Sequence, residues 1–252
     1  MIQIDRLPAF EDNYLWGLRE GQTAWVVDPG DGKVVLDWLD RHQLVLSGIL
    51  LTHHHADHVG GVQTLLDRYP MAEVIGSKQQ LAGASASVSE GDVVDLLSRR
   101  FHIMEVPGHT LDHVAYLSMD PFPILFCGDT LFLGGCGRMF EGTPEQFQHS
   151  LARFQALPPE TLIYCAHEYT QANLEFAKTI LPDNQSVLDR LDQVKTLRKN
   201  NVATVPDRLV NELHTNPYFR LDDPVLMDVI KATDDTPMHE RFARVRAAKD
   251  NA

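Results

Sequence analysis

The stretch GILLTHHHADH (48–58) joins an apolar run to a cluster of histidine and aspartate side chains. GILL has the apolar, β-forming character of a buried strand, and the polar residues begin where such a strand would end. In an extended segment, side chains two apart point the same way, so His53 and His55 can reach one point together. Asp57 and His58 follow as the chain turns toward two glycines, and they can reach a second point nearby. Burying such side chains without partners is costly, so we expect metal ions here rather than a solvated histidine-rich loop.

Three later segments also place a histidine or an aspartate directly after an apolar, β-like run. They are PGHT (107–110), CGDT (127–130) and CAHE (165–168). Functional side chains collect at strand ends in layered α/β folds. A single histidine in such a place is more often a packed or capping residue, so each segment alone is a weak signal. Their recurrence predicts that they complete the metal coordination.

The composition is that of an acidic globular chain. Of 252 residues, 44% are hydrophobic, and no apolar run approaches the ~18 residues that a membrane helix needs. The formal net charge of -13 repels nucleic acid and anionic lipid, so we expect neither as a partner. The N-terminal residues lack the basic and apolar regions of a signal peptide, which predicts a cytoplasmic protein. The number of cysteines, three, argues against a disulfide framework.

Strand-like and helix-like segments are mixed in the first part of the chain, and helix-like segments alone follow. We expect an α/β domain over residues 1–172 and a mostly helical domain over residues 173–252. Thr143, Pro144 and Gln146 form the capping-box signature of a helix start. The predicted strands cover 24–28, 48–52 and 124–129, and the other predicted helices cover 34–42, 62–70, 170–182, 186–200, 223–233 and 236–250.

The order and spacing of THHHADH, PGHT, GDT and AHEY resemble the metallo-β-lactamase superfamily, and within it the glyoxalase II (hydroxyacylglutathione hydrolase) family. The C-terminal segments narrow the resemblance from the superfamily to this family. It implies an αββα sandwich as the catalytic domain, followed by a helical substrate-binding domain. Further segments that resemble the family are DNYLW (12–16), GGCGRMFEGT (134–143), HEYT (167–170), NPYFR (216–220) and RVRAAKD (244–250).

The resemblance also implies a set of seven metal ligands, four of which the spacing alone had indicated. All are nitrogen or oxygen ligands, which suit Zn, Fe or Mn. We expect two divalent metal ions per chain, with zinc as the first choice. One ion would be held by His53, His55 and His109, the other by Asp57, His58 and His167, and both by a bridging Asp129.

The implied activity is hydrolysis of S-(2-hydroxyacyl)glutathione thioesters such as S-lactoylglutathione, the second step of methylglyoxal detoxification. The two metal charges lower the pKa of a shared water toward ~7, and the resulting hydroxide would attack the thioester carbonyl. Asp57 and Asp129 are the expected catalytic carboxylates, and Asp57 would orient the hydroxide. The thiolate leaving group, with a thiol pKa near ~8.5, needs little help from a general acid.

Glutathione carries two carboxylates, and basic residues cluster near the end of this chain. Arg246 and Lys249 are three residues apart and therefore neighbours on one helix face. A solvated helix face is the alternative, but the family pattern places anchors for the glycine carboxylate at these two positions. The resemblance adds Arg138, Phe140 and Tyr169 to the glutathione pocket. Some family members carry a tyrosine in place of Phe140, so the phenylalanine would lose one hydrogen bond.

Other functions are possible on the same scaffold. A glutathione persulfide dioxygenase would use a single iron, and the full ligand set argues against it. A lactonase or a β-lactamase is a second alternative, although the missing export signal disfavours a periplasmic lactamase. A non-catalytic zinc module would favour cysteines and four ligands per metal. We expect a monomeric enzyme that acts on a small molecule.

Several residues near the predicted ligands have structural interpretations. His54 lies between two ligands and should point away from the metals, whereas His113 is expected to pack beside the site. Cys127 and Cys165 each precede a ligand by two residues and are expected to be small buried hydrophobic residues rather than ligands. Cys136 lies in a glycine-rich loop, where its role is open.

Overall fold

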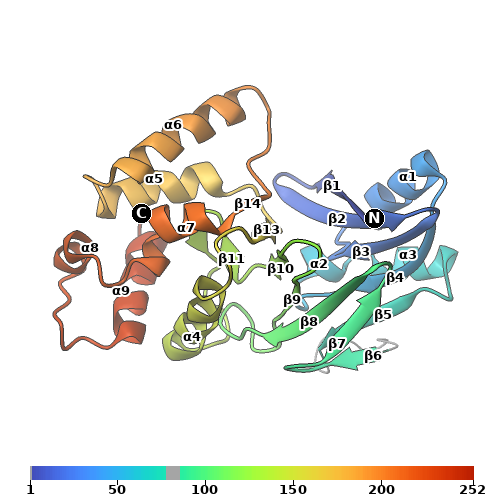
Figure 1. Cartoon of the computed structure of the whole chain (residues 1–252), viewed down its shortest axis with the longest axis horizontal. Coiled ribbons are helices and arrows are strands. Elements are labelled where there is room, and N and C mark those ends of the chain that lie inside the picture. Colours follow the sequence, from blue (N-terminus) through green and yellow to red (C-terminus); the bar gives the residue numbers. More distant parts are fainter. Residues whose placement is uncertain (1, 78–85) are drawn as a thin grey trace. The chain divides into compact units, whose positions relative to one another are not determined.

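The computed structural model describes residues 2–77 and 86–252 and divides into two compact units (Figure 1). The first unit consists of Met1–Glu105 with Asp112–Gly128, and the second consists of Val106–Leu111 with Asp129–Ala252. The predicted boundary near residue 172 concerns domains rather than these units and stays a prediction. Among the described residues, no helix has the length and apolar character needed to cross a membrane.

The first unit contains a six-stranded sheet in which the strands follow one another in chain order. The first three strands pair antiparallel, and the third to sixth pair parallel. Because parallel strands need a crossover connection, helices separate the third strand from the fourth and the fourth from the fifth. The strands are β1 (Gln3–Ala9), β2 (Asn13–Glu20), β3 (Thr23–Val27), β4 (Val45–Leu50), β5 (Glu73–Ser77) and β6 (Ala86–Val88), and the helices are α1 (Gly32–His42), α2 (Ala56–Val59) and α3 (Val62–Arg68).

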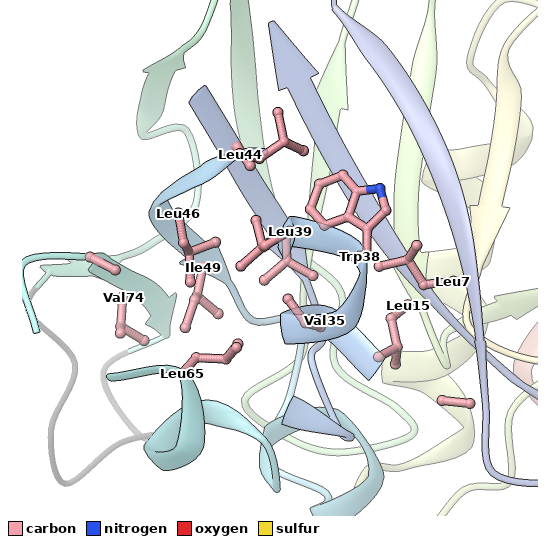
Figure 2. Packing of buried hydrophobic residues seen from close by; sticks show 14 of the residues in the cluster. Leu7, Leu15, Val35, Trp38, Leu39, Leu44, Leu46, Ile49, Leu65 and Val74 are labelled. Atoms are coloured by element: carbon pink, nitrogen blue, oxygen red, sulfur yellow. The ribbon is translucent and has the colours of Figure 1, made fainter. Parts of the chain in front are cut away.

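Helix α1 packs its apolar face on this sheet. Asp31 caps it by accepting hydrogen bonds from the backbone N–H groups of Lys33 and Val34. Figure 2 shows Trp38 of α1 beside Leu15 of β2, within a cluster of buried aliphatic side chains. This core holds β4 in place, and the predicted ligand run leaves the sheet where β4 ends.

A second set of strands in the first unit forms an antiparallel meander. It comprises β7 (Val93–Leu96), β8 (Arg99–Glu105), β9 (Val114–Ser118) and β10 (Ile124–Gly128). Every residue of β9 and β10 is buried, as expected for strands covered on both faces. The hydroxyl of Tyr116 on β9 donates to the carbonyl of Leu51 at 2.7 Å, which ties the meander to the end of β4.

The second unit is mostly helical, with two short pairs of strands. Helix α4 (Pro144–Gln155) begins with the predicted capping box, in which Thr143 and Gln146 exchange hydrogen bonds. The strands are β11 (Leu131–Phe132), β12 (Gly135–Cys136), β13 (Leu162–Cys165) and β14 (Asp207–Arg208). The other helices are α5 (Thr170–Ile180), α6 (Gln185–Lys199), α7 (Leu209–Thr215), η1 (Pro217–Phe219), α8 (Pro224–Val229) and α9 (Met238–Asp250).

Each predicted strand and helix overlaps one in the structure. The elements of the second unit that were not predicted are β11, β12, β14, α7 and η1, which are too short to show a period. The three-residue spacing from Leu188 to Leu197 predicts one buried face of α6, yet Leu197 is exposed. Steps of three fall behind the 3.6-residue helical turn, so the actual buried stripe runs from Val187 through Leu191 to Val194.

Candidate metal centre and substrate anchors

The run from His53 to His58 brings four predicted ligands together within the first unit. His53 is fully buried at the end of β4, and its Nε2 lies 3.1 Å from Nδ1 of His55. The rings of His53 and His58 are 4.0 Å apart between centroids. Asp57 and His58 lie in the short helix α2, which directly follows His55.

Thr52 fixes the protonated nitrogen of His53. The hydroxyl of Thr52 donates its single proton to Oδ2 of Asp28 at 2.7 Å. The same hydroxyl oxygen lies 3.0 Å from Nδ1 of His53, where it can only accept. Nδ1 of His53 therefore carries the ring proton and Nε2 carries the lone pair, which is the state a metal ligand requires.

Asp28 organises this group, and sequence reasoning did not select it. Its carboxylate accepts from the backbone N–H and the hydroxyl of Thr52, and its Oδ2 lies 3.0 Å from Nδ1 of His58. Asp28 follows β3 with a left-handed φ of 51°, a conformation that aspartate tolerates better than most residues. Its position after a buried strand was the available signal, but no histidine in the sequence flanks it.

The carboxylate of Asp57 is held between two side chains of the first unit. Its Oδ2 lies 3.5 Å from Nε2 of His58 and accepts a 3.0 Å hydrogen bond from Nδ2 of Asn13. The backbone of Asp57 passes so close to Gly30 that a Cβ there would lie 1.8 Å from the Asp57 carbonyl oxygen. Glycine at this position therefore lets α2 pack against the loop after β3.

The second unit brings the other three predicted ligands together. Nδ1 of His109 donates to the carbonyl of Arg138 at 2.7 Å, so Nε2 again carries the lone pair. Asp129 lies between two histidines: its Oδ2 is 3.5 Å from Nε2 of His109, and its Oδ1 is 3.5 Å from Nε2 of His167. A Cβ on Gly137 would lie 2.0 Å from the Asp129 carbonyl oxygen, so only glycine fits beside this pair.

The separations within both groups fit the ligands of a metal ion. Two atoms that each lie about 2.1 Å from a tetrahedral metal are about 3.4 Å apart. Hydrogen bonds between nitrogen and oxygen are shorter, at about 2.9 Å. The donor set contains only nitrogen and oxygen, which Zn, Fe and Mn accept. The 3.5 Å pairs are His58–Asp57, His109–Asp129 and His167–Asp129.

Two histidines near the ligands take the structural positions expected of them. His54 is exposed, and its Nδ1 lies 3.1 Å from Oδ1 of Asp112. His113 is fully buried and stacks on His53 with ring centroids 4.7 Å apart. Stacking of this kind restricts the rotation of the His53 ring.

All three cysteines are buried free thiols. Burial raises the pKa of Cys136 to about 11 and that of Cys165 to about 12, so both remain protonated near neutral pH. Cys127 and Cys165 are fully buried in strands, which confirms the prediction that they are small hydrophobic residues. Cys136 lies next to Arg246, whose Nη1 donates to the Cys136 carbonyl at 3.1 Å.

Arg246 and Lys249 lie on α9, as predicted, and both contact the second unit's own backbone. Arg246 is buried, and besides the Cys136 carbonyl it pairs with Asp250 at 2.8 Å. Lys249 donates to the carbonyl of Ala172 at 3.2 Å. Burial, and after it the charge of Arg246, holds the pKa of Lys249 below its usual value.

The three other predicted anchors are more exposed. Arg138 is exposed, and Phe140 is 60% exposed with its ring edge-on to His109. Tyr169 stacks on His167, with ring centroids 4.8 Å apart and an interplanar angle of 7°. These aromatic contacts place two anchors directly beside predicted ligands of the second unit.

Two family models together cover almost the whole chain. Residues 15–167 match the metallo-β-lactamase superfamily, and residues 168–252 match the C-terminus of hydroxyacylglutathione hydrolase. Among solved structures, that of ETHE1 from Myxococcus xanthus has a TM-score of 0.68 at 24% identity, covering 98% of each chain. The BLEG-1 B3 metallo-β-lactamase has a TM-score of 0.66 at 20% identity, covering 86% of this chain and all of the other. These likenesses confirm the predicted fold.

Curated relatives share much more of the sequence. A hydroxyacylglutathione hydrolase of Pseudomonas putida (strain F1) is 48% identical, and one of Pseudomonas aeruginosa (strain LESB58) is 46% identical, each over 99% of both chains. One of Photobacterium profundum is 45% identical over the full length of both. The chain therefore belongs to the hydroxyacylglutathione hydrolase family of the metallo-β-lactamase superfamily.

Proposed function

We propose that this chain hydrolyses the thioester of S-(2-hydroxyacyl)glutathione, such as S-lactoylglutathione, to glutathione and a 2-hydroxy acid. Its place in metabolism would be the second step of methylglyoxal detoxification. The observation that carries the proposal is the pair of histidine–aspartate groups, in which protein partners hold the ring protons on the atoms that face away from the ligand positions. The relatives that carry the hydroxyacylglutathione hydrolase name over their full length support the substrate class.

Histidine and aspartate side chains of the described residues form groups that could hold metal ions, which supports two divalent ions per chain. Zinc is the proposed metal, with iron or manganese as alternatives. Such ions would polarise the thioester carbonyl and lower the pKa of a water molecule toward ~7. The proposed ligands are His53, His55 and His109 for one ion, Asp57, His58 and His167 for the other, and Asp129 for both.

The chain's own side chains prepare the reaction. Thr52 and the Arg138 carbonyl keep the ring protons of His53 and His109 on Nδ1, so that both Nε2 atoms remain acceptors. Asp57 and Asp129 are the carboxylates that orient the attacking water. The water gives up a proton to solvent, and its oxygen adds to the carbonyl carbon. The C–S bond of the tetrahedral adduct then breaks, and the thiolate leaves with the bonding electron pair. Because that thiol has a pKa near ~8.5, it departs without a dedicated general acid.

The second unit supplies the proposed glutathione anchors. Arg246 and Lys249 offer positive charge for the glycine carboxylate, against the chain's overall charge of -13. Arg138 adds an exposed cation, and Tyr169 presents a hydroxyl on a ring held by His167. Phe140 offers an apolar wall without a hydroxyl. We further propose a cytoplasmic monomer without nucleic-acid or membrane partners.

One assay tests the function directly. The purified chain is loaded with zinc, iron or manganese, its metal content is measured, and hydrolysis of S-lactoylglutathione is followed in the same sample. We expect turnover with about two metal ions per chain, loss of turnover with a chelator, and recovery on reloading. A chain that holds two metal ions but leaves this thioester intact would contradict the proposal. Oxygen uptake with glutathione persulfide in its place would identify a dioxygenase.

A further inference from the structure

The segment DNYLW (12–16) is part of the family resemblance, yet no site residue had been assigned to it. It begins β2, where side chains alternate between the two faces of the sheet. Leu15 points to the face covered by α1, where it packs near Trp38 (Figure 2). Asn13, two residues earlier, shares that face. Ala9, its partner on β1, belongs to the same buried cluster.

Asn13 is therefore a polar side chain beside a buried apolar cluster, and only 6% of it is exposed. Its Nδ2 donates to Oδ2 of Asp57 at 3.0 Å, across 44 residues of sequence. Nε2 of His58 lies 3.5 Å from the same oxygen. The hydrogen bond from Asn13 thus restricts the rotation of the Asp57 carboxylate, while Nε2 of His58 lies beside the same oxygen at the separation expected of two metal ligands.

The amide suits this task for a chemical reason. An asparagine N–H donates to a carboxylate without carrying a charge, so it orients the group and leaves its full negative charge for a cation. A lysine or an arginine in its place would form an ion pair and compete with the cation. Groups that orient a metal-binding carboxylate in this way commonly change metal affinity by about 10–100-fold when removed.

We propose that Asn13 is a positioning residue that holds the Asp57 carboxylate ready for a metal ion. Because the inference rests on the ligand set proposed above, it concerns the ion assigned to Asp57 and His58. The other ion, assigned to His53 and His55, should be affected much less. The expected signature is a selective weakening of one of two binding steps.

The experiment titrates the metal-free full chain with zinc in competition with a chromophoric chelator. We expect wild type to show two binding steps, and Asn13→Ala to weaken one of them by about 10–100-fold. Asn13→Asp should weaken the same step further, because it places a second carboxylate against Asp57. Trp38→Phe is the matched control: it removes a buried N–H donor to the carboxylate of Asp5, 3.1 Å away in the same unit, and should leave both steps unchanged.

The outcomes separate this inference from the proposed function. Equal titration curves for wild type and Asn13→Ala would overturn the inference. The inference would also fail if Asn13→Ala weakened both steps equally, or if Trp38→Phe weakened them as much as Asn13→Ala does. If Asn13→Ala shows the selective weakening and the metal-loaded wild type does not cleave S-lactoylglutathione, only the proposed function is contradicted. Turnover measured at saturating zinc should recover in Asn13→Ala toward the wild-type value, since a positioning residue acts through metal occupancy.

Discussion

The predicted metal ligands and the predicted substrate anchors differ in how the protein holds them. In each predicted ligand group, one histidine is oriented by a contact to its Nδ1. The Thr52 hydroxyl makes this contact with His53, and the Arg138 carbonyl makes it with His109. The two cationic anchors of α9 are instead engaged at their charged ends, Arg246 with the Cys136 carbonyl and Lys249 with the Ala172 carbonyl. The predicted ligand groups are therefore preorganised, whereas a substrate bound at the predicted anchors would share or exchange their existing contacts.

Asp129→Ala should have the largest effect. Its carboxylate lies 3.5 Å from both His109 and His167, so the substitution removes the group that links them. We expect loss of thioester hydrolysis together with loss of bound metal, measured by activity and by elemental analysis of one preparation. The control is Asp189→Ala, which removes an exposed carboxylate on α6 and should retain both activity and bound metal. Full turnover with normal metal content in Asp129→Ala would remove this residue from the ligand set.

Glu212→Ala should produce the next largest effect, through the support of the β11–β12 hairpin. Glu212 is fully buried, accepts from the backbone N–H of Gly134 at 2.7 Å, and pairs with Arg190. Arg190 would keep Asp207 as a partner at 3.0 Å, but it would lose its buried carboxylate, and the Gly134 N–H would lose its acceptor. We expect a cost of about 1–3 kcal/mol in the free energy of unfolding, measured by urea denaturation. Its control is Glu175→Ala, which breaks a half-exposed pair with Lys195 and should cost at most about 1 kcal/mol.

A loss for Glu212→Ala as small as that of its control would show that the β11–β12 hairpin does not depend on this buried network. The hairpin matters because its last residue, Cys136, provides the carbonyl that holds Arg246. The predicted ligands of the first unit have a different support, since Asp28 accepts from Thr52 beside them.

The local parts of the site could be predicted from the sequence, and the parts that depend on long-range contacts could not. Residues 53–58 lie within one short run after a strand, so their convergence follows from the period of an extended chain. The contacts of Asp28 and Asn13 are hydrogen bonds across 24 and 44 residues, and neither residue type is distinctive where it stands. Geometry in three dimensions was needed to find them.

The helices show the same difference between local signals, which the sequence reveals, and long-range contacts, which it does not. The capping box at Thr143 is a local signal, and α4 begins where it predicts. Arg190 looks like a solvent-facing residue of an amphipathic helix, but it is buried because α7 provides Glu212 opposite it. Since α7 has only seven residues, it contains too few turns for a periodic pattern to reveal its apolar face.

Lys249→Glu tests whether the anchors of α9 exchange their contacts for substrate. Losing one attraction and adding one repulsion at a partly exposed charge, each up to about 1 kcal/mol, should raise KM about tenfold and leave metal content unchanged. Burial lowers the pKa of Lys249, so in wild type the lysine loses its charge as pH rises, before an ordinary lysine would. KM should therefore increase at alkaline pH in wild type and stay flat in Lys249→Glu. An unchanged KM at neutral pH would exclude Lys249 from the pocket, with Lys195→Glu as the control.

Phe140→Tyr should have the smallest effect, and it would strengthen binding. The ring is 60% exposed and already rests against His109, so a hydroxyl can be added without repacking. One neutral hydrogen bond to the glutathione peptide contributes about 0.5–1.5 kcal/mol, and solvent exposure favours the lower end, a decrease in KM of about twofold. The control is Phe122, which is also exposed but lies in the first unit, and Phe122→Tyr should leave KM unaltered. If Phe140→Tyr behaves like this control, position 140 does not face the substrate, and the exposed anchors would reduce to Arg138 and Tyr169.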